Sequence, residues 1–233
     1  MFQHLIAGAL LFSVTALPQT KPLSKSMAQG PHRMELTLEK KFDSGWRAVD
    51  PGTVFDKNDL LRFRYKTNFD GLLYVMNQGT SGTYVKLFPR EDTGTTNQVK
   101  AGKEYMVPAT GLGSFRVDGP PGYDIVYWVI QPDTQKAYEP LPPPPAPTPG
   151  DKLPSHLTPR CDDTILRARG DCVDSGAGAQ TIQDKQKLPD NIKGAAGSKS
   201  QDLVIRKNEN VSMVASPVPL NGPVVYEFRL AHK

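Results

Sequence analysis

The sequence contains few of the side chains that carry enzymatic or metal chemistry. Among 233 residues there are two cysteines and four histidines, and neither a GxSxG nor an HExxH motif occurs. A hydrolase needs a nucleophile with a base, or two opposed carboxylates, and a structural zinc ion needs four ligands. The sequence therefore argues against an enzyme, and we predict no catalytic residue, no metal and no cofactor.

Long apolar runs are also missing, and no stretch reaches the roughly 18 residues of a membrane-spanning helix. The run LIAGALLFSV at residues 5–14 has the length of a signal-peptide core, and Val14-Thr15-Ala16 follows it as a cleavage site. No Lys or Arg precedes this run, so a buried N-terminal strand or helix is the alternative. We predict a signal peptide over residues 1–16, a secreted or periplasmic location, and no membrane span in the mature chain.

The sequence has no large excess of charge of either sign. The 28 basic and 24 acidic residues give a net charge of +4, and no segment concentrates the basic ones. Binding to a phosphate backbone needs such a basic cluster, so nucleic acid is not an expected partner. By contrast, 20 glycines and 22 prolines are present, which argues against a helical bundle and favours a turn-rich β protein.

The two cysteines, Cys161 and Cys172, lie close together in CDDTILRARGDC. In an exported chain such a pair predicts one disulfide that closes a small loop. Neither a CxxC motif nor a pair of histidines lies nearby.

Several segments alternate between apolar and polar residues with the period of two that is typical of half-buried strands. In MELTLEK the apolar residues are Met34, Leu36 and Leu38, and LRFRYKT repeats the pattern over residues 61–67. A turn at residues 68–71 precedes LLYVMN, which is apolar on both faces. These features predict a hairpin over residues 60–77 whose second strand is covered on both sides.

Further short strands are expected between glycine and proline turns. They lie at residues 83–88, 97–100, 103–108, 114–118 and 123–130, the last one apolar on both faces. Seven or eight strands at this spacing predict an all-β fold, either an antiparallel β-sandwich or a barrel-like pair of sheets.

The composition divides the chain further. Seven of the ten residues at 140–149 are proline, which predicts a stiff linker. Residues 174–201 are rich in small and polar residues and are expected to be disordered. Three strands follow, and we favour their return to the same sheet. The expected parts are a signal peptide (1–16), a flexible lead-in (17–32), a β-sandwich domain (33–133), a Pro-rich linker (134–150), a cystine loop with a low-complexity segment (151–201) and C-terminal strands (202–233).

The candidate recognition loop is Arg90, Glu91 and Asp92, since these residues follow Pro89 at a strand end, where recognition loops usually lie. Two weaker candidates remain. One is an aromatic platform of Trp46, Tyr84, Tyr105 and Trp128, although core packing explains Trp128 better. The other is a calcium site of Asp162, Asp163, Asp171 and Asp174, which lacks the DxDxDG spacing.

Several sequence motifs resemble those of the bacterial family called domain of unknown function 4384. They are FDGLLYVMN, LFPRE, AGKEYMVPA and FRVDGPPGYDIVYWVIQP. The resemblance covers about residues 46–131. It implies an extracytoplasmic β-module with a sensory or interaction role, and it supplies no catalytic residues to transfer.

Two hypotheses of function follow. The first is an exported, non-catalytic binding or interaction module of the bacterial cell envelope, whose partner is another envelope protein or a glycan. The alternative is a cell-envelope hydrolase whose carboxylates converge only in the folded chain.

Overall fold

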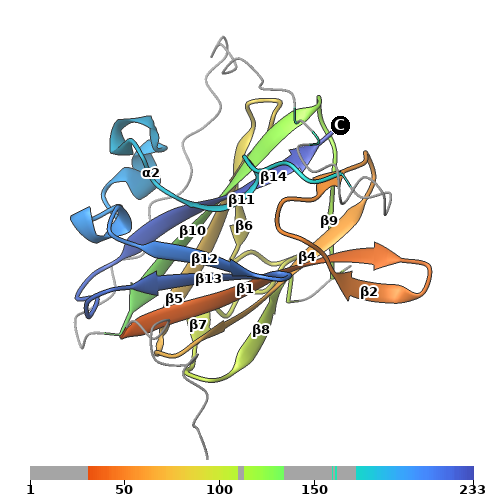
Figure 1. Cartoon of the computed structure of the whole chain (residues 1–233). Helices are drawn as coiled ribbons and strands as arrows, with labels where there is room; N and C mark the ends of the chain where they lie inside the picture. The colour runs from red at the N-terminus through yellow and green to blue at the C-terminus, as the bar shows by residue number, and fades with distance from the viewer. Residues whose placement is uncertain (1–30, 110–112, 134–158, 160, 162–171) are drawn as a thin grey trace, which may run out of the picture.

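The computed structural model describes residues 31–109, 113–133, 159, 161 and 172–233. Two seven-stranded sheets pack face to face, and no barrel closes (Figure 1). The first sheet has the order β12-β13-β1-β4-β8, with β2 and β9 at its margins, and the second has the order β11-β14-β10-β5-β6, with β3 and β7. Among the strands of the described residues, all pairs are antiparallel except β3 with β14. The predicted all-β sandwich is confirmed.

The bounds of the elements are as follows. In the first sheet they are β1 His32–Phe42, β2 Gly45–Ala48, β4 Leu60–Thr67, β8 Glu104–Val107, β9 Phe115–Arg116, β12 Val204–Asn208 and β13 Val211–Ser216. In the second sheet they are β3 Val54–Phe55, β5 Gly71–Gln78, β6 Tyr84–Phe88, β7 Gln98–Val99, β10 Gly122–Pro132, β11 Gly178–Thr181 and β14 Val224–His232. The short helices are η1 Lys185–Lys187, α2 Asp190–Lys193 and η2 Ser198–Ser200.

The main core lies between the two sheets and is built around aromatic rings. Trp128 on β10 is fully buried, contacts Phe63 of β4 edge-on at 5.2 Å between ring centroids, and stacks on Tyr226 of β14 at 6.2 Å. Met34, Leu36 and the other alternating apolar residues of β1 also point into this core. The period-two patterns therefore mark the inner faces of the strands.

The predicted hairpin at residues 60–77 is wrong, because β4 and β5 belong to different sheets. β4 pairs with β1, and β5 pairs with β10. The turn between them carries the chain across the sandwich, with Phe69 buried in the core and the Thr67 hydroxyl donating to the Phe69 carbonyl at 2.8 Å. The two strands thus oppose their apolar faces across the core.

The C-terminal strands return to the sandwich but do not all join one sheet. β12 and β13 extend the first sheet beside β1, whereas β14 lies inside the second sheet, between β10 and β11. On β14 the inward residues Val224, Tyr226 and Phe228 join the main core. The tail therefore completes both sheets.

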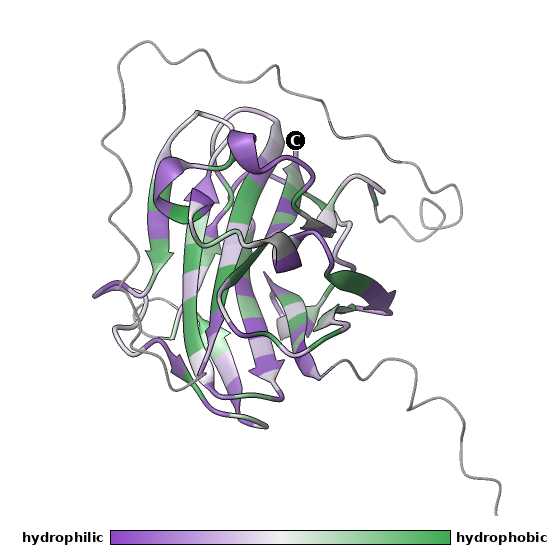
Figure 2. Cartoon of the chain, turned by 90° about the vertical axis from the view of Figure 1, so that its left-hand side faces the viewer, coloured by the Kyte–Doolittle hydropathy of each residue, from purple (hydrophilic) through white to green (hydrophobic). Residues whose placement is uncertain are grey.

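Residues 174–201 were expected to be disordered, and within the described structure they form ordered elements instead. β11 is the edge strand of the second sheet, beside β14, and the three short helices lie along the outer face of that sheet (Figure 1). Ile182, Leu188 and Ile192 are buried there against Tyr127 and Val225 of the sheet. In Figure 2 this helical layer lies in front of strands with long hydrophobic stretches. The small and polar composition of residues 174–201 predicted disorder, because it is an average over the segment. The few apolar residues in the segment are nevertheless spaced so that they cover the sheet.

Several expectations fall outside the described residues. These are the signal peptide at residues 1–16, most of the flexible lead-in at residues 17–32, and the Pro-rich linker at residues 134–150. In the part of the chain that is described, no helix is both long and apolar enough to cross a membrane.

Candidate functional site

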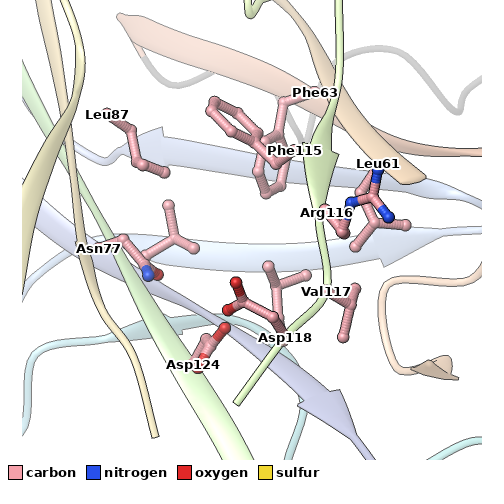
Figure 3. A pocket seen from close by; sticks show the side chains of 11 residues that line it. Leu61, Phe63, Asn77, Leu87, Phe115, Arg116, Val117, Asp118 and Asp124 are labelled. Atoms are coloured by element: carbon pink, nitrogen blue, oxygen red, sulfur yellow. The ribbon is translucent and has the colours of Figure 1, made fainter. Parts of the chain in front are cut away.

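A pocket of about 190 Å³ opens between the two sheets at one end of the sandwich (Figure 3). Both sheets supply apolar walls. Leu61, Phe63 and Phe115 come from the first sheet, and Leu87, Val126 and Leu230 come from the second. The pocket is thus an extension of the main core that reaches solvent.

The pocket exists because apolar inward residues give way to polar ones at this end of the second sheet. On β10 the inward positions run from Trp128 through Val126 to Asp124, and on β5 they run from Val75 to Asn77. Asn77 and Asp124 cannot pack as closely as the apolar residues behind them without losing hydration. The core therefore ends here in a partly polar cavity.

Asp124 is held in place by its neighbours. Its Oδ1 atom accepts a hydrogen bond from the Thr80 backbone N–H at 2.8 Å, and His232 Nε2 lies 3.4 Å from the same oxygen. His232 Nε2 and Thr80 Oγ1 are both buried and make no hydrogen bond to any described residue. The buried surroundings of Asp124 are therefore polar but incompletely satisfied.

Asp118 supplies the second carboxylate of the pocket. In Figure 3 the carboxyl groups of Asp118 and Asp124 point toward one another, while the guanidinium of Arg116 points away from both. Gly119 follows Asp118 with φ of +87°, and a Cβ there would lie 2.9 Å from Thr80 Oγ1. This close approach of the turn to Thr80 brings the two carboxylates together.

The described residues contain no group of three or more His, Cys, Asp or Glu side chains that could hold a metal ion. The pocket itself offers two carboxylates and one amide, which suits hydrogen-bond donors and cations better than anions.

The predicted recognition loop lies on the surface beyond β6. Arg90, Glu91 and Asp92 are exposed, and the Arg90 guanidinium binds both carboxylate oxygens of Asp92, Nη2 to Oδ2 at 2.6 Å. This hydrogen bonding lowers the pKa of Asp92 below its ordinary value. None of the three residues lines the pocket. The role of the loop in recognition stays a prediction.

The predicted disulfide between Cys161 and Cys172 is confirmed, with a Cα–Cα distance of 5.0 Å. It is tied to the second sheet, because the carbonyl of Cys172 accepts a hydrogen bond from the Val54 N–H at 2.8 Å. Of the four aspartates proposed as calcium ligands, only Asp174 lies within the described residues. Asp174 binds the Tyr123 hydroxyl and the Gly176 N–H.

The four aromatic residues considered as a platform are dispersed. Trp128 is core, as expected, and Tyr105 stacks on Tyr65 at 5.4 Å between ring centroids. Trp46 lies under the Arg62 guanidinium in the first sheet, whereas Tyr84 contacts Tyr127 within the second sheet. They form no common surface.

The sequence-based reasoning missed Asp118 and Asp124. A signal was available for Asp124, because it occupies an inward position of a strand that is otherwise apolar at Val126, Trp128 and Ile130. No such signal marks Asp118, which reaches the pocket only through the conformation of the following turn.

Residues 54–132 match the family model described as Domain of unknown function (DUF4384), which confirms the predicted resemblance. This segment runs from β3 to β10 and contributes every pocket-lining residue except Leu230. No curated protein and no solved structure matches the chain.

Proposed function

We propose that this chain, whose residues 54–132 belong to the DUF4384 family, is an exported, non-catalytic binding module of the bacterial cell envelope. One observation carries the proposal, namely the pocket between the two sheets, with apolar walls and a polar mouth. Sites that bind small groups are concave and mostly apolar, and a few polar atoms in them fix orientation.

Export is supported by two features. The apolar run at residues 5–14 has the length of a signal-peptide core, and the Cys161–Cys172 disulfide suits an oxidising compartment. Mass spectrometry of the protein recovered from the periplasm or medium is expected to show a new terminus at Leu17. A protein that retains Met1 there would contradict the proposal.

The hydrolase alternative is favoured by one specific observation, the convergence of Asp118 and Asp124 on one pocket. Against it, none of the lining residues is a Ser, Thr, Cys, His or Lys that could act as a nucleophile or partner base. The lowered pKa of Asp92 likewise disfavours proton donation by the surface loop, since a general acid needs a raised pKa.

The binding proposal is tested by filling the pocket. In the full chain with labelled Leu and Val methyl groups, a panel of small amphipathic compounds is expected to shift the NMR signals of Leu61, Val126 and Leu230. Leu87→Trp places a larger side chain in the cavity and should abolish these shifts. The matched control, Val204→Trp on the exposed edge strand β12, should leave them unchanged.

Two results would contradict the proposal. One is that no compound of the panel shifts these methyl signals, or that the shifts persist in Leu87→Trp. The other is turnover of a glycan, peptide or ester substrate that is lost in Asp118→Asn or Asp124→Asn, which would establish the hydrolase.

A further inference from the structure

We infer that the pocket receives the side chain of a basic residue, lysine or arginine, presented by a partner protein. The apolar stem of that side chain would lie along Phe115 and Leu87, and its cationic head would lie between Asp118 and Asp124. This inference rests on the proposed binding function and specifies the chemistry of the ligand.

The size of the cavity limits the ligand to a group as large as one long side chain. Pockets that enclose a drug-sized molecule or cofactor measure roughly 300–1,000 Å³. The present cavity of about 190 Å³ is smaller and has room for one long side chain. It opens to solvent between two sheet ends, so a residue projecting from another protein can enter without the sandwich opening.

The charge of the pocket selects a cation. Two carboxylates face each other at its mouth, and the amide of Asn77 adds a further acceptor oxygen. Arg116 does not neutralise them, because its guanidinium points away from both carboxylates in Figure 3. A bound cation would relieve the repulsion between the two carboxylates.

Buried polar groups that contact Asp124 provide a second observation. The imidazole of His232 and the hydroxyl of Thr80 are each at least nine-tenths buried, and both have a polar atom without a hydrogen bond to a described residue. The Thr80 N–H and His232 both lie against Oδ1 of Asp124. This arrangement fixes the carboxylate and leaves Oδ2 for an incoming donor, which is how a binding site is preorganised.

The walls suit the stem of a basic side chain. Lys and Arg bury their methylene groups along apolar surface while the charged head stays near polar groups. Leu61 and Phe115, which are register partners on β4 and β9, supply such a surface together with Phe63.

The test is an NMR titration of the full chain with blocked amino acids. N-acetyl-lysine methylamide and its arginine analogue are expected to bind at least tenfold more tightly than the norleucine analogue, which keeps the stem but lacks the charge. The glutamate analogue should not bind. Asp118→Asn and Asp124→Asn should each weaken lysine binding about tenfold, because a charge-assisted hydrogen bond becomes a neutral one.

The matched control is Asp190→Asn, which removes an exposed carboxylate from α2 on the outer layer and should leave the affinity unchanged. Thermal unfolding of each variant checks its fold. Asp118 is exposed, so Asp118→Asn keeps the test decisive if Asp124→Asn unfolds.

The outcomes separate the inference from the function on which it rests. Equal binding of the norleucine and lysine analogues, or tighter binding of the glutamate analogue, overturns the inference and leaves a binding module. Binding of pentylamine without binding of the blocked lysine also overturns it, since the ligand would then be a free amine. If no compound in this titration or in the amphipathic panel shifts the pocket signals, both fall.

Discussion

His32 links the start of the sandwich to the loop before its last strand. Its Nδ1 atom accepts a hydrogen bond from the Leu220 N–H at 2.9 Å, and its ring packs edge-on against Phe69. The acceptor must be unprotonated, and burial lowers the pKa of His32 below the ordinary value of 6.5. The contact is therefore complete only while the ring is neutral.

We predict that His32 makes the stability of the protein depend on pH. The unfolded chain binds the proton more readily, so this contribution is present above pH 6.5 and is lost as the pH falls through the lowered pKa. Urea unfolding at pH 7.5, 6.5 and 5.5 should show a steeper loss of stability in the wild type than in His32→Gln. Parallel losses in the two proteins would refute this role.

Gly119 shapes the pocket, because it combines a φ of +87° with a close approach to Thr80. We predict that Gly119→Ala destabilises the protein by about 1–3 kcal/mol. Gly102→Ala is the matched control, since Gly102 has a similar φ of +77° and nothing within 4 Å of an added Cβ. In urea unfolding, Gly119→Ala should cost more than Gly102→Ala, and adding Thr80→Ala should recover the difference. Equal costs would show that the approach to Thr80 does not matter.

At the scale of elements, the layer over the second sheet explains why β5 and β10 are apolar on both faces. Met76 and Val129 point away from the main core and are buried by residues 182–196. The apolar outer faces of these strands predict a covering layer, and residues 182–196 supply it. Tyr74 lies on this covered face but is half-buried, so truncating it should cost less than the roughly 3–5 kcal/mol of a fully buried aromatic residue.

We predict that Ile192→Ala lowers the free energy of unfolding by about 2–4 kcal/mol, since Ile192 on α2 is completely buried. Val204→Ala on the exposed strand β12 is the control and should change stability by less than about 0.5 kcal/mol. The measurement is equilibrium urea unfolding. A negligible effect at Ile192 would restore the interpretation of this segment as disordered.

The sequence predicts where the strands lie better than it predicts which strands pair with one another. Alternation at Met34, Leu36 and Leu38 identifies an inner face, because burial repeats with the pleat. Alternation carries no information on which strand lies beside this one. The short turn at residues 68–71 therefore predicts a hairpin, although in the structure it crosses between the two sheets. The pocket was equally hidden, because Asp118 and Asp124 meet only through the bend of the turn between them.

At the scale of the whole molecule, the family segment does not contain a complete sandwich. In the first sheet β4 of the segment pairs with β1, and in the second sheet β10 pairs with β14. Both partner strands lie outside residues 54–132 and bring Leu36 and Phe228 into the main core. The fold therefore depends on strands from the beginning and the end of the described chain.

We predict that residues 46–133 alone do not fold. Without β1 and β14, the central strands β4 and β10 would each have an unpaired edge, and the core would lose buried side chains on both sides. The expressed fragment should give poorly dispersed NMR spectra and no cooperative thermal transition, whereas the full chain gives both. Adding residues 172–233 to residues 31–133 as a separate chain should restore a cooperative transition, since these pieces together hold the fourteen strands of the described structure. A cooperative transition in residues 46–133 alone would show that the family segment folds as an independent domain. The strands outside it would then not be needed for folding.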